Sequence, residues 1–316
     1  MNDKSRPPTF ERPFPALTSD QRYHFEVYGY TVVENTLEPD EIKECKEAVY
    51  RIRDELLKLE DPGAGGPRCK DAYLASNNPH HYFMTNILEV EPAVTAYATH
   101  PRLVSMAEEI MGGEARIVEI NAHINSKIPE TDFTQEPKYG FHRGADIPFS
   151  THVNKGLIHC SFVKTLTSLT DLGPDDGGTV VVAGSHKVDI PSQQLIEAAY
   201  ADRSLIHQVV APAGSTLLFA ETLIHATGQI RSNNERVILI TGYGSTMFPY
   251  WDNGTLSEEF ENTIPEHLRT LFKGKVHWTR NPRYRTLEEP VDDREFSLGN
   301  WDDRNRTESP KPDDLR

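Results

Sequence analysis

The sequence predicts a mainly β fold, a sandwich or barrel of short strands with helices at its flanks. Between about residues 115 and 245, short runs rich in β-branched and aromatic residues are separated by Gly, Pro, Asn and Asp, which favour turns. Short strands at this spacing are typical of an all-β sandwich or barrel. The expected strands lie at residues 116–120, 162–172, 179–182, 215–219 and 237–241.

The N-terminal segment is expected to contain helices and one strand. Thr-Ser-Asp at 18–20 is a typical helix start, and Gly-Tyr-Thr-Val-Val at 29–33 has the β-branched content of a strand. An amphipathic helix is predicted from residue 38 to about residue 59, because apolar residues recur there at helical spacing. After a Pro- and Gly-rich break at 61–67, a further helix is predicted at 101–111, ended by two glycines.

Composition limits the possible functions. The chain has 48 acidic and 33 basic residues, and its net charge of -15 argues against binding to nucleic acid or anionic membranes. No apolar run approaches the roughly 20 residues needed to cross a bilayer, and the polar start does not resemble a signal peptide. Cys45, Cys69 and Cys160 are widely spaced without a CxxC motif, which favours reduced thiols and a cytoplasmic protein.

One domain is expected over residues 1–316, since a chain of this length can bury a single substantial core. Residues 18–113 form its helix-and-strand N-terminal segment, and residues 114–245 form the β core. Residues 246–301 are expected to cover that core. The polar, Pro-containing stretch 302–316 is predicted to be a mobile tail.

Two histidines and an arginine give the strongest signal of chemistry. His142, within Gly-Phe-His-Arg-Gly, lies far upstream of His225, and Arg236 follows one strand later. This suggests a mononuclear iron site, in which two His and a carboxylate bind Fe(II) on one face, beside a dicarboxylate cosubstrate. Arg236 opens an apolar run, so its guanidinium is expected inside, where a carboxylate is its best partner. The alternative is a surface ion pair with Glu235 or another surface acid.

An ordered set of motifs links the chain to a known family. They are Tyr-Gly-Tyr-Thr-Val-Val at 28–33, Leu-Glu-Pro-Asp-Glu-Ile at 37–42, Lys-Ile-Pro at 127–129, a block from Leu-Thr-Asp-Leu at 169–172 through Asp-Gly-Gly-Thr at 176–179 to Gly-Ser-His-Lys at 184–187, and then His225, Thr227 and Arg236. Over most of residues 18–245 the chain resembles the phytanoyl-CoA dioxygenase-like family of Fe(II)/2-oxoglutarate oxygenases. The resemblance implies a double-stranded β-helix (jelly-roll or cupin-like) core, with the metal between its two sheets.

The resemblance also implies roles for individual residues. His142 and His225 are expected to bind Fe(II) as neutral imidazoles. Arg236 is expected to hold the far carboxylate of 2-oxoglutarate, with the Thr227 hydroxyl as a second donor. Charge-assisted hydrogen bonds of this kind contribute on the order of 1.5–3 kcal/mol each. Lys127 and Asn125 are lesser candidates near the same pocket, and a solvated Lys127 fits the sequence equally well.

Gly144 departs from the family pattern, because it occupies the position of the carboxylate ligand two residues after the first histidine. Four outcomes are open. Asp146, which has the right strand parity, or a histidine substitutes as ligand. A halide fills the position, as in aliphatic halogenases of the wider superfamily that carry His-x-Gly or His-x-Ala. A two-histidine site works with bound water, or the metal chemistry is lost.

Three other histidines have simpler interpretations. For His152 and His159 a packing or loop role is favoured, although either could complete a three-histidine site. His186 is interpreted as structural.

The sequence therefore predicts a catalytic domain that depends on Fe(II) and 2-oxoglutarate, with O2 as cosubstrate. It is expected to hydroxylate an unactivated C–H bond of a small-molecule substrate and to release succinate and CO2. The alternatives are an aliphatic halogenase that uses chloride, suggested by Gly144, and a non-catalytic jelly-roll binding protein. Space for a halide beside Gly144, with no carboxylate nearby, would favour the halogenase. An Arg236 turned to solvent would favour the binding protein. No pattern predicts the substrate's identity or the oligomeric state.

Overall fold

Two antiparallel sheets form the body of the protein in the computed structural model, which describes residues 16–63, 72–144, 150–154, 156–245, 248, 256–265 and 268–273. The large sheet contains, in order across it, β1 (Tyr30–Val33), β10 (Thr216–Ala220), β7 (Phe162–Ser168), β12 (Arg236–Ser245), β4 (Ala115–Asn125), β3 (His81–Thr85) and β2 (Tyr73–Asn78). The small sheet contains β11 (His225–Ala226), β8 (Val180–Val182) and β9 (Ile206–Gln208), and a separate hairpin pairs β5 (Thr151–Asn154) with β6 (Leu157–Cys160).

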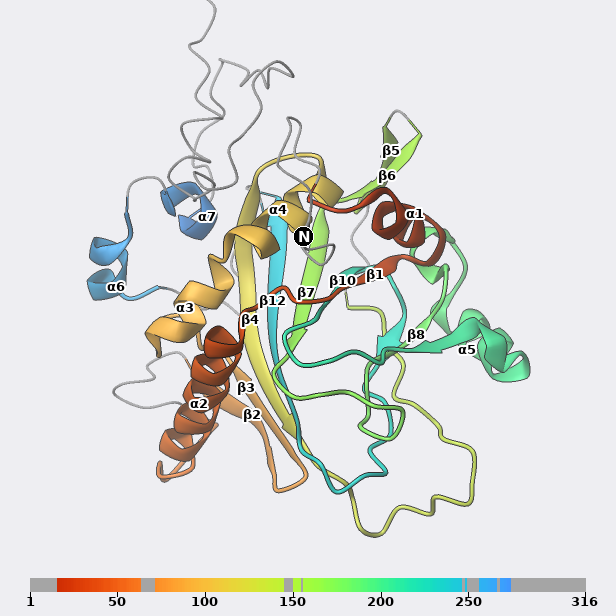
Figure 1. Cartoon of the computed structure of the whole chain (residues 1–316), viewed down its shortest axis with the longest axis horizontal. Helices are drawn as coiled ribbons and strands as arrows, with labels where there is room; N and C mark the ends of the chain where they lie inside the picture. The colour runs from red at the N-terminus through yellow and green to blue at the C-terminus, as the bar shows by residue number, and fades with distance from the viewer. Residues whose placement is uncertain are drawn as a thin grey trace, which may run out of the picture.

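Helices flank this body on both sides. They are α1 (Ser19–Tyr28), α2 (Pro39–Leu56), α3 (Pro92–Ala98), α4 (Pro101–Met111), α5 (Ser192–Ala201), α6 (Glu258–Thr263) and α7 (Arg269–Lys273), with short 3-10 turns η1 (Ser185–Lys187) and η2 (Arg203–Leu205). Helices α2, α3 and α4 lie on one side of the large sheet, and β8 and α5 lie on the other (Figure 1). The predicted mainly β fold with flanking helices is confirmed.

Strand β12 shows how the two faces of the large sheet differ. Val237 and Leu239 share a core with buried residues of α2, α3 and α4. Ile238 lies on the opposite face and belongs to a second core with Val181 of the small sheet. Because side chains alternate along a strand, Arg236 shares this inner face with Ile238. The first residue of β12 is thereby directed between the two sheets.

Helix boundaries follow the predicted signals. Thr18 is the N-cap of α1, where its hydroxyl accepts from the Gln21 amide in a capping box. Gly112 ends α4 in the left-handed conformation, with φ 69°. The long helix α2 stops at Leu56, a few residues before the predicted end.

Two central strands are longer than predicted. β4 runs on to Asn125 and β12 to Ser245, whereas the sequence predicted strands at 116–120 and 237–241. Polar residues and glycines lower the β propensity of both second halves. Each strand nevertheless has a partner on both sides, β3 and β12 for β4 and β4 and β7 for β12, and this pairing overrides local propensity. Conversely, the strand expected over 162–172 ends at Ser168.

Some expectations concern residues that the structure does not describe. Cys45 and Cys160 are free and buried, as expected for reduced thiols, whereas Cys69 lies outside the described residues. The predicted tail 302–316 and most of the cover 246–301 also lie outside them, so the division into segments stays a prediction. Within the described part of the chain, no helix is both long and apolar enough to span a membrane.

His186 packs inside the protein, in agreement with a structural role. It is 4% exposed, its ring lies against Gly29, and neither ring nitrogen has a hydrogen-bond partner. Burial, reinforced by the charge of Lys187, lowers the pKa of His186 to about 4. The folded protein therefore resists protonation at a pH where the unfolded chain, with an ordinary histidine pKa of about 6.5, accepts a proton.

This difference predicts acid sensitivity with a defined pH window. Above about pH 6.5 His186 does not change the free energy of unfolding. As the pH falls from 6.5 towards 4, protonation of this histidine in the unfolded chain lowers the free energy of unfolding by about 3 kcal/mol in total. We expect His186→Leu to remove this part of the pH dependence, because leucine has similar volume and does not titrate. The measurement is the free energy of unfolding by urea at pH 7.5 and pH 5 for both proteins. Equal pH dependence in the two would contradict the assignment.

Candidate active site

His142 and His225 are held opposite each other by a backbone bridge. The His142 amide donates to the His225 carbonyl at 3.0 Å, and the His225 amide donates to the His142 carbonyl at 2.9 Å. Directly opposed residues of an antiparallel pair project from the same side. Their ring centroids are 4.4 Å apart. The structure thus brings together the two histidines singled out in the sequence.

Each imidazole is oriented by a carbonyl two residues earlier in the chain. Nδ1 of His142 lies 3.2 Å from the Gly140 oxygen, and Nδ1 of His225 lies 2.8 Å from the Leu223 oxygen. A carbonyl only accepts, so each Nδ1 donates, and in the neutral ring this leaves Nε2 as the nitrogen that can bind a metal. Metal-binding histidines are commonly fixed in this way by a carbonyl on the second nitrogen. The pair therefore fits a metal ion bound through both Nε2 atoms.

The protonation state of His225 also suits a metal. Burial, reinforced by the nearby His142 and Lys164, lowers the pKa of His225 to about 3. The ring is therefore neutral at physiological pH, which is the form that binds a metal.

His152 and His159 lie elsewhere, in the β5–β6 hairpin. They face each other across it with ring centroids 5.4 Å apart, and Nδ1 of His159 lies 3.0 Å from the carbonyl oxygen of Ile110 in α4. Among the described residues, no three His, Cys, Asp or Glu side chains are already gathered as a metal site. The structure therefore adds neither histidine to the pair formed by His142 and His225. Asp146 lies outside the described residues.

Arg236 is buried between the sheets, and no acidic residue in the described part of the chain pairs with it. It is 1% exposed. One terminal nitrogen donates to Asn125 Oδ1 at 3.0 Å, the other donates to Thr179 Oγ1 at 3.1 Å, and Nε has no hydrogen-bond partner within the described ranges. Burial lowers the pKa of Arg236 to about 10, so it stays charged at neutral pH, and no described carboxylate offsets the burial. Such a cation is costly unless an anion joins it, and the site therefore fits a carboxylate.

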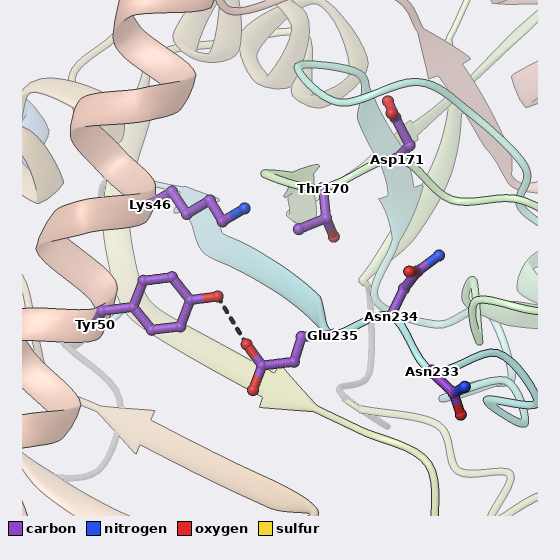
Figure 2. A pocket seen from close by; sticks show the side chains of 7 residues that line it. All are labelled: Lys46, Tyr50, Thr170, Asp171, Asn233, Asn234 and Glu235. Carbon is purple, nitrogen blue, oxygen red and sulfur yellow. Dashed lines mark hydrogen bonds between the residues drawn. The ribbon is translucent and has the colours of Figure 1, made fainter.

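Glu235 does not provide that anion. Figure 2 shows Glu235 in a surface pocket of about 440 Å³ beside α2, where the Tyr50 hydroxyl donates to its Oε2 at 2.8 Å. The other residues lining this pocket are Lys46, Thr170, Asp171, Asn233 and Asn234. The alternative of a surface ion pair between Arg236 and Glu235 is therefore wrong.

Comparison with known proteins agrees with this geometry. The family model described as phytanoyl-CoA dioxygenase matches residues 25–238, more than half of the chain. The chain belongs to the phytanoyl-CoA dioxygenase family. It is thus an oxygenase of the 2-oxoglutarate-dependent type.

Relatives of this family member include the ectoine dioxygenase of Nocardia farcinica, 23% identical over 231 residues that cover 66% of this chain and 72% of that protein. The peroxisomal phytanoyl-CoA dioxygenase of Rattus norvegicus is 23% identical over 268 residues, 79% of this chain and 75% of the rat protein. The solved structure of HygX from Streptomyces hygroscopicus with nickel and 2-oxoglutarate bound has a TM-score of 0.58 at 21% identity, over 75% of this chain and 90% of HygX. These likenesses confirm the predicted jelly-roll core.

The remaining predicted cofactor residues of this phytanoyl-CoA dioxygenase family member are spread more widely. Asn125, a lesser candidate, contacts Arg236 because the two are register partners between β4 and β12. The threonine that contacts Arg236 is Thr179, whereas Thr227 is exposed, and its proposed contact with 2-oxoglutarate stays a prediction. Nζ of Lys127 lies 5.0 Å from the ring centroid of Phe133. A contact of Lys127 with 2-oxoglutarate stays a prediction.

Three ionisable residues near the site were not predicted. Nζ of Lys164 on β7 lies 2.8 Å from Glu119 Oε1 and 3.0 Å from Glu221 Oε1. Burial raises the pKa of Glu221 to about 7, although Lys164 opposes that shift. Each of the three stands in or directly beside an otherwise apolar strand run, where a charge needs a partner. A charged residue within such a run could have identified these three residues from the sequence.

Gly144 lies directly against one of these residues. A Cβ atom added at Gly144 would be 1.5 Å from Oε1 of Glu221 and 2.4 Å from its Cδ. The backbone of Gly144 is not in the left-handed region that favours glycine. The absence of a side chain at this position is therefore explained by the close approach of the Glu221 carboxylate.

Proposed function

We propose that this oxygenase hydroxylates an unactivated C–H bond of a small molecule, with Fe(II) held by His142 and His225 and the far carboxylate of 2-oxoglutarate held by Arg236. The observation that carries the proposal is the buried Arg236 guanidinium, which has no acidic partner among the described residues and lies on the same inner face as the histidine pair. When bound, iron and 2-oxoglutarate supply the oxidising chemistry, in which the keto acid becomes succinate and CO2.

The spacing of the two half-sites supports a shared cosubstrate. Thr179, which contacts Arg236, directly precedes β8, and Val181 of β8 is the register partner of His225. Two residues along a strand span roughly 7 Å and return to the same face. Arg236 and His225 are therefore separated along the small sheet by a length that a five-carbon keto acid can bridge. In this arrangement Arg236 fixes one end of 2-oxoglutarate and thereby orients the other end towards the histidines.

The alternatives have less support. Oε1 of Glu221 would be 1.5 Å from a Cβ at Gly144, so a carboxylate fills the space that a halide needs in a His-x-Gly halogenase. Hydroxylation is therefore favoured over halogenation. A buried Arg236 also disfavours a binding protein without catalysis, because the guanidinium would remain uncompensated.

A small-molecule substrate agrees with the solved relatives. HygX has been seen with hygromycin B and 2-oxoglutarate bound, and EctD from S. alaskensis with 2-oxoglutarate and 5-hydroxyectoine. For the present chain we propose only the class, a small molecule. The test is incubation of the iron-loaded protein with 2-oxoglutarate in air. Equimolar release of succinate and CO2 supports the proposal, and no consumption of 2-oxoglutarate under any substrate mixture would contradict it.

A further inference from the structure

The space beside His142 that a carboxylate would fill is already filled by another carboxylate. Atoms of the Glu221 side chain approach the Cβ position of Gly144 in the order Oε1 at 1.5 Å, Cδ at 2.4 Å and Cγ at 3.2 Å. The end of the glutamate thus points at the place where an aspartate side chain at position 144 would begin. The Glu221 carboxylate therefore ends beside the backbone position from which the carboxylate ligand of the family is expected to project.

The fold brings Glu221 to this place from a different strand. β10 ends at Ala220, and a turn in which the Leu223 amide donates to the Ala220 carbonyl at 2.9 Å leads to His225. Glu221 therefore lies at the start of the same turn that delivers the second histidine. Its amide donates to the Phe162 carbonyl at 3.2 Å, which anchors it on β7.

The Glu221 carboxylate has an unused oxygen. Its side chain is 3% exposed, Oε1 lies 3.0 Å from Nζ of Lys164, and Oε2 has no hydrogen-bond partner among the residues that the structure describes. A buried carboxylate oxygen without a donor or cation is unfavourable, and such an atom in a native protein needs an explanation. A metal ion bound at the neighbouring histidines supplies one.

We propose that Glu221 is the carboxylate ligand of the iron site and replaces the residue missing at Gly144. This inference rests on the proposed function. Because no three potential ligands are gathered among the described residues, Glu221 must turn from Lys164 towards the metal. Lys164 then keeps its second partner, Glu119, at 2.8 Å. The resulting set of two histidines and one carboxylate has the composition of the common iron-binding triad, with its carboxylate taken from the turn after β10.

Mn²⁺ affinity, measured by calorimetry without 2-oxoglutarate, tests the proposal without relying on activity. Glu221→Gln is expected to raise the Mn²⁺ dissociation constant by more than about 100-fold, beyond the roughly 10–100-fold cost of losing a group that only orients a ligand. Glu119→Gln is the matched control, because it removes the other carboxylate on Lys164. It is expected to raise the constant by less than about tenfold. Equal effects of the two variants would make Glu221 only a counterion of Lys164 and overturn the proposal.

A rescue experiment guards against loss of folding. Gly144→Asp combined with Glu221→Ala is expected to recover most of the lost Mn²⁺ affinity, since it moves the carboxylate back to position 144. Gly144→Asp alone is expected to give no gain, because Glu221 already supplies a carboxylate to the metal. No rescue in a double variant that melts like the wild type would overturn the proposal. Wild-type protein that binds no Mn²⁺ would instead overturn the proposed function, and this inference with it.

Discussion

Replacing Arg236 by leucine is expected to weaken the binding of 2-oxoglutarate by at least about 100-fold, because two charge-assisted hydrogen bonds of about 1.5–3 kcal/mol each are lost. The protein should remain folded, since an apolar side chain relieves an uncompensated buried charge. Calorimetric titration of Mn²⁺-loaded protein with 2-oxoglutarate measures the effect. Mn²⁺ affinity itself should change little, because Arg236 is not placed among the metal ligands. Unchanged 2-oxoglutarate affinity would contradict the assigned role of Arg236.

Two threonine variants serve as controls for this prediction. Thr179→Val removes the hydroxyl that accepts from Arg236 at 3.1 Å and should weaken 2-oxoglutarate binding by about tenfold, the effect of one hydrogen bond. Thr227→Val tests the donor predicted from the sequence, at an exposed position. If Thr227→Val weakens 2-oxoglutarate binding more than Thr179→Val does, Thr227 contacts the cosubstrate directly. Thr179 then contributes less to 2-oxoglutarate affinity than its contact with Arg236 suggests.

Replacing His225 by alanine is expected to abolish metal binding, because it removes one of two imidazoles whose Nε2 atoms are free to bind. His142→Ala should have the same result. The readout is the metal content after dialysis against Mn²⁺, together with the melting temperature in its presence and absence. Metal stabilises a folded protein by mass action, so the wild type should melt at a higher temperature with Mn²⁺ and the variants should not.

His152→Ala is the matched control for the histidine prediction. His152 is a histidine of the same region, but it pairs with His159 in the β5–β6 hairpin instead of with His225. Metal content and the shift in melting temperature should equal those of the wild type. A loss of metal comparable to that of His225→Ala would place His152 in the metal site and contradict the assignment made here.

The sequence was sufficient for the fold class and for the positions of His142, His225 and Arg236. The two histidines were singled out by their match to the family's motif, and Arg236 by its place at the start of an apolar run, where a charge needs a partner. Their roles in binding metal and cosubstrate stay predictions. The sequence could not decide whether Arg236 is buried or exposed, because the adjacent Glu235 could pair with it at the surface. Strand register resolves this point, because it turns Arg236 inward to Asn125 and leaves Glu235 with Tyr50.

Glu221 and Thr179 escaped prediction for a different physical reason. Each acts through a neighbour that is distant in sequence, Gly144 and Arg236 respectively, and local periodicity carries no information on such pairs. From the sequence, Gly144 leaves the ligand position empty. The side chain that fills this space belongs to Glu221, in the turn after β10. A missing side chain in one strand can therefore be supplied by another, and only the packing reveals it.

The most direct test of the whole account is an anaerobic titration of the protein with Fe(II) and 2-oxoglutarate, with and without chloride, monitored through the visible metal-to-keto-acid charge-transfer band. The account predicts that the band forms and that chloride leaves it unchanged, because Glu221 fills the place beside Gly144. A band that shifts with chloride would show a halide in that place and make the protein a halogenase candidate. No band, in folded protein with ample iron, would contradict the proposed iron and 2-oxoglutarate site itself.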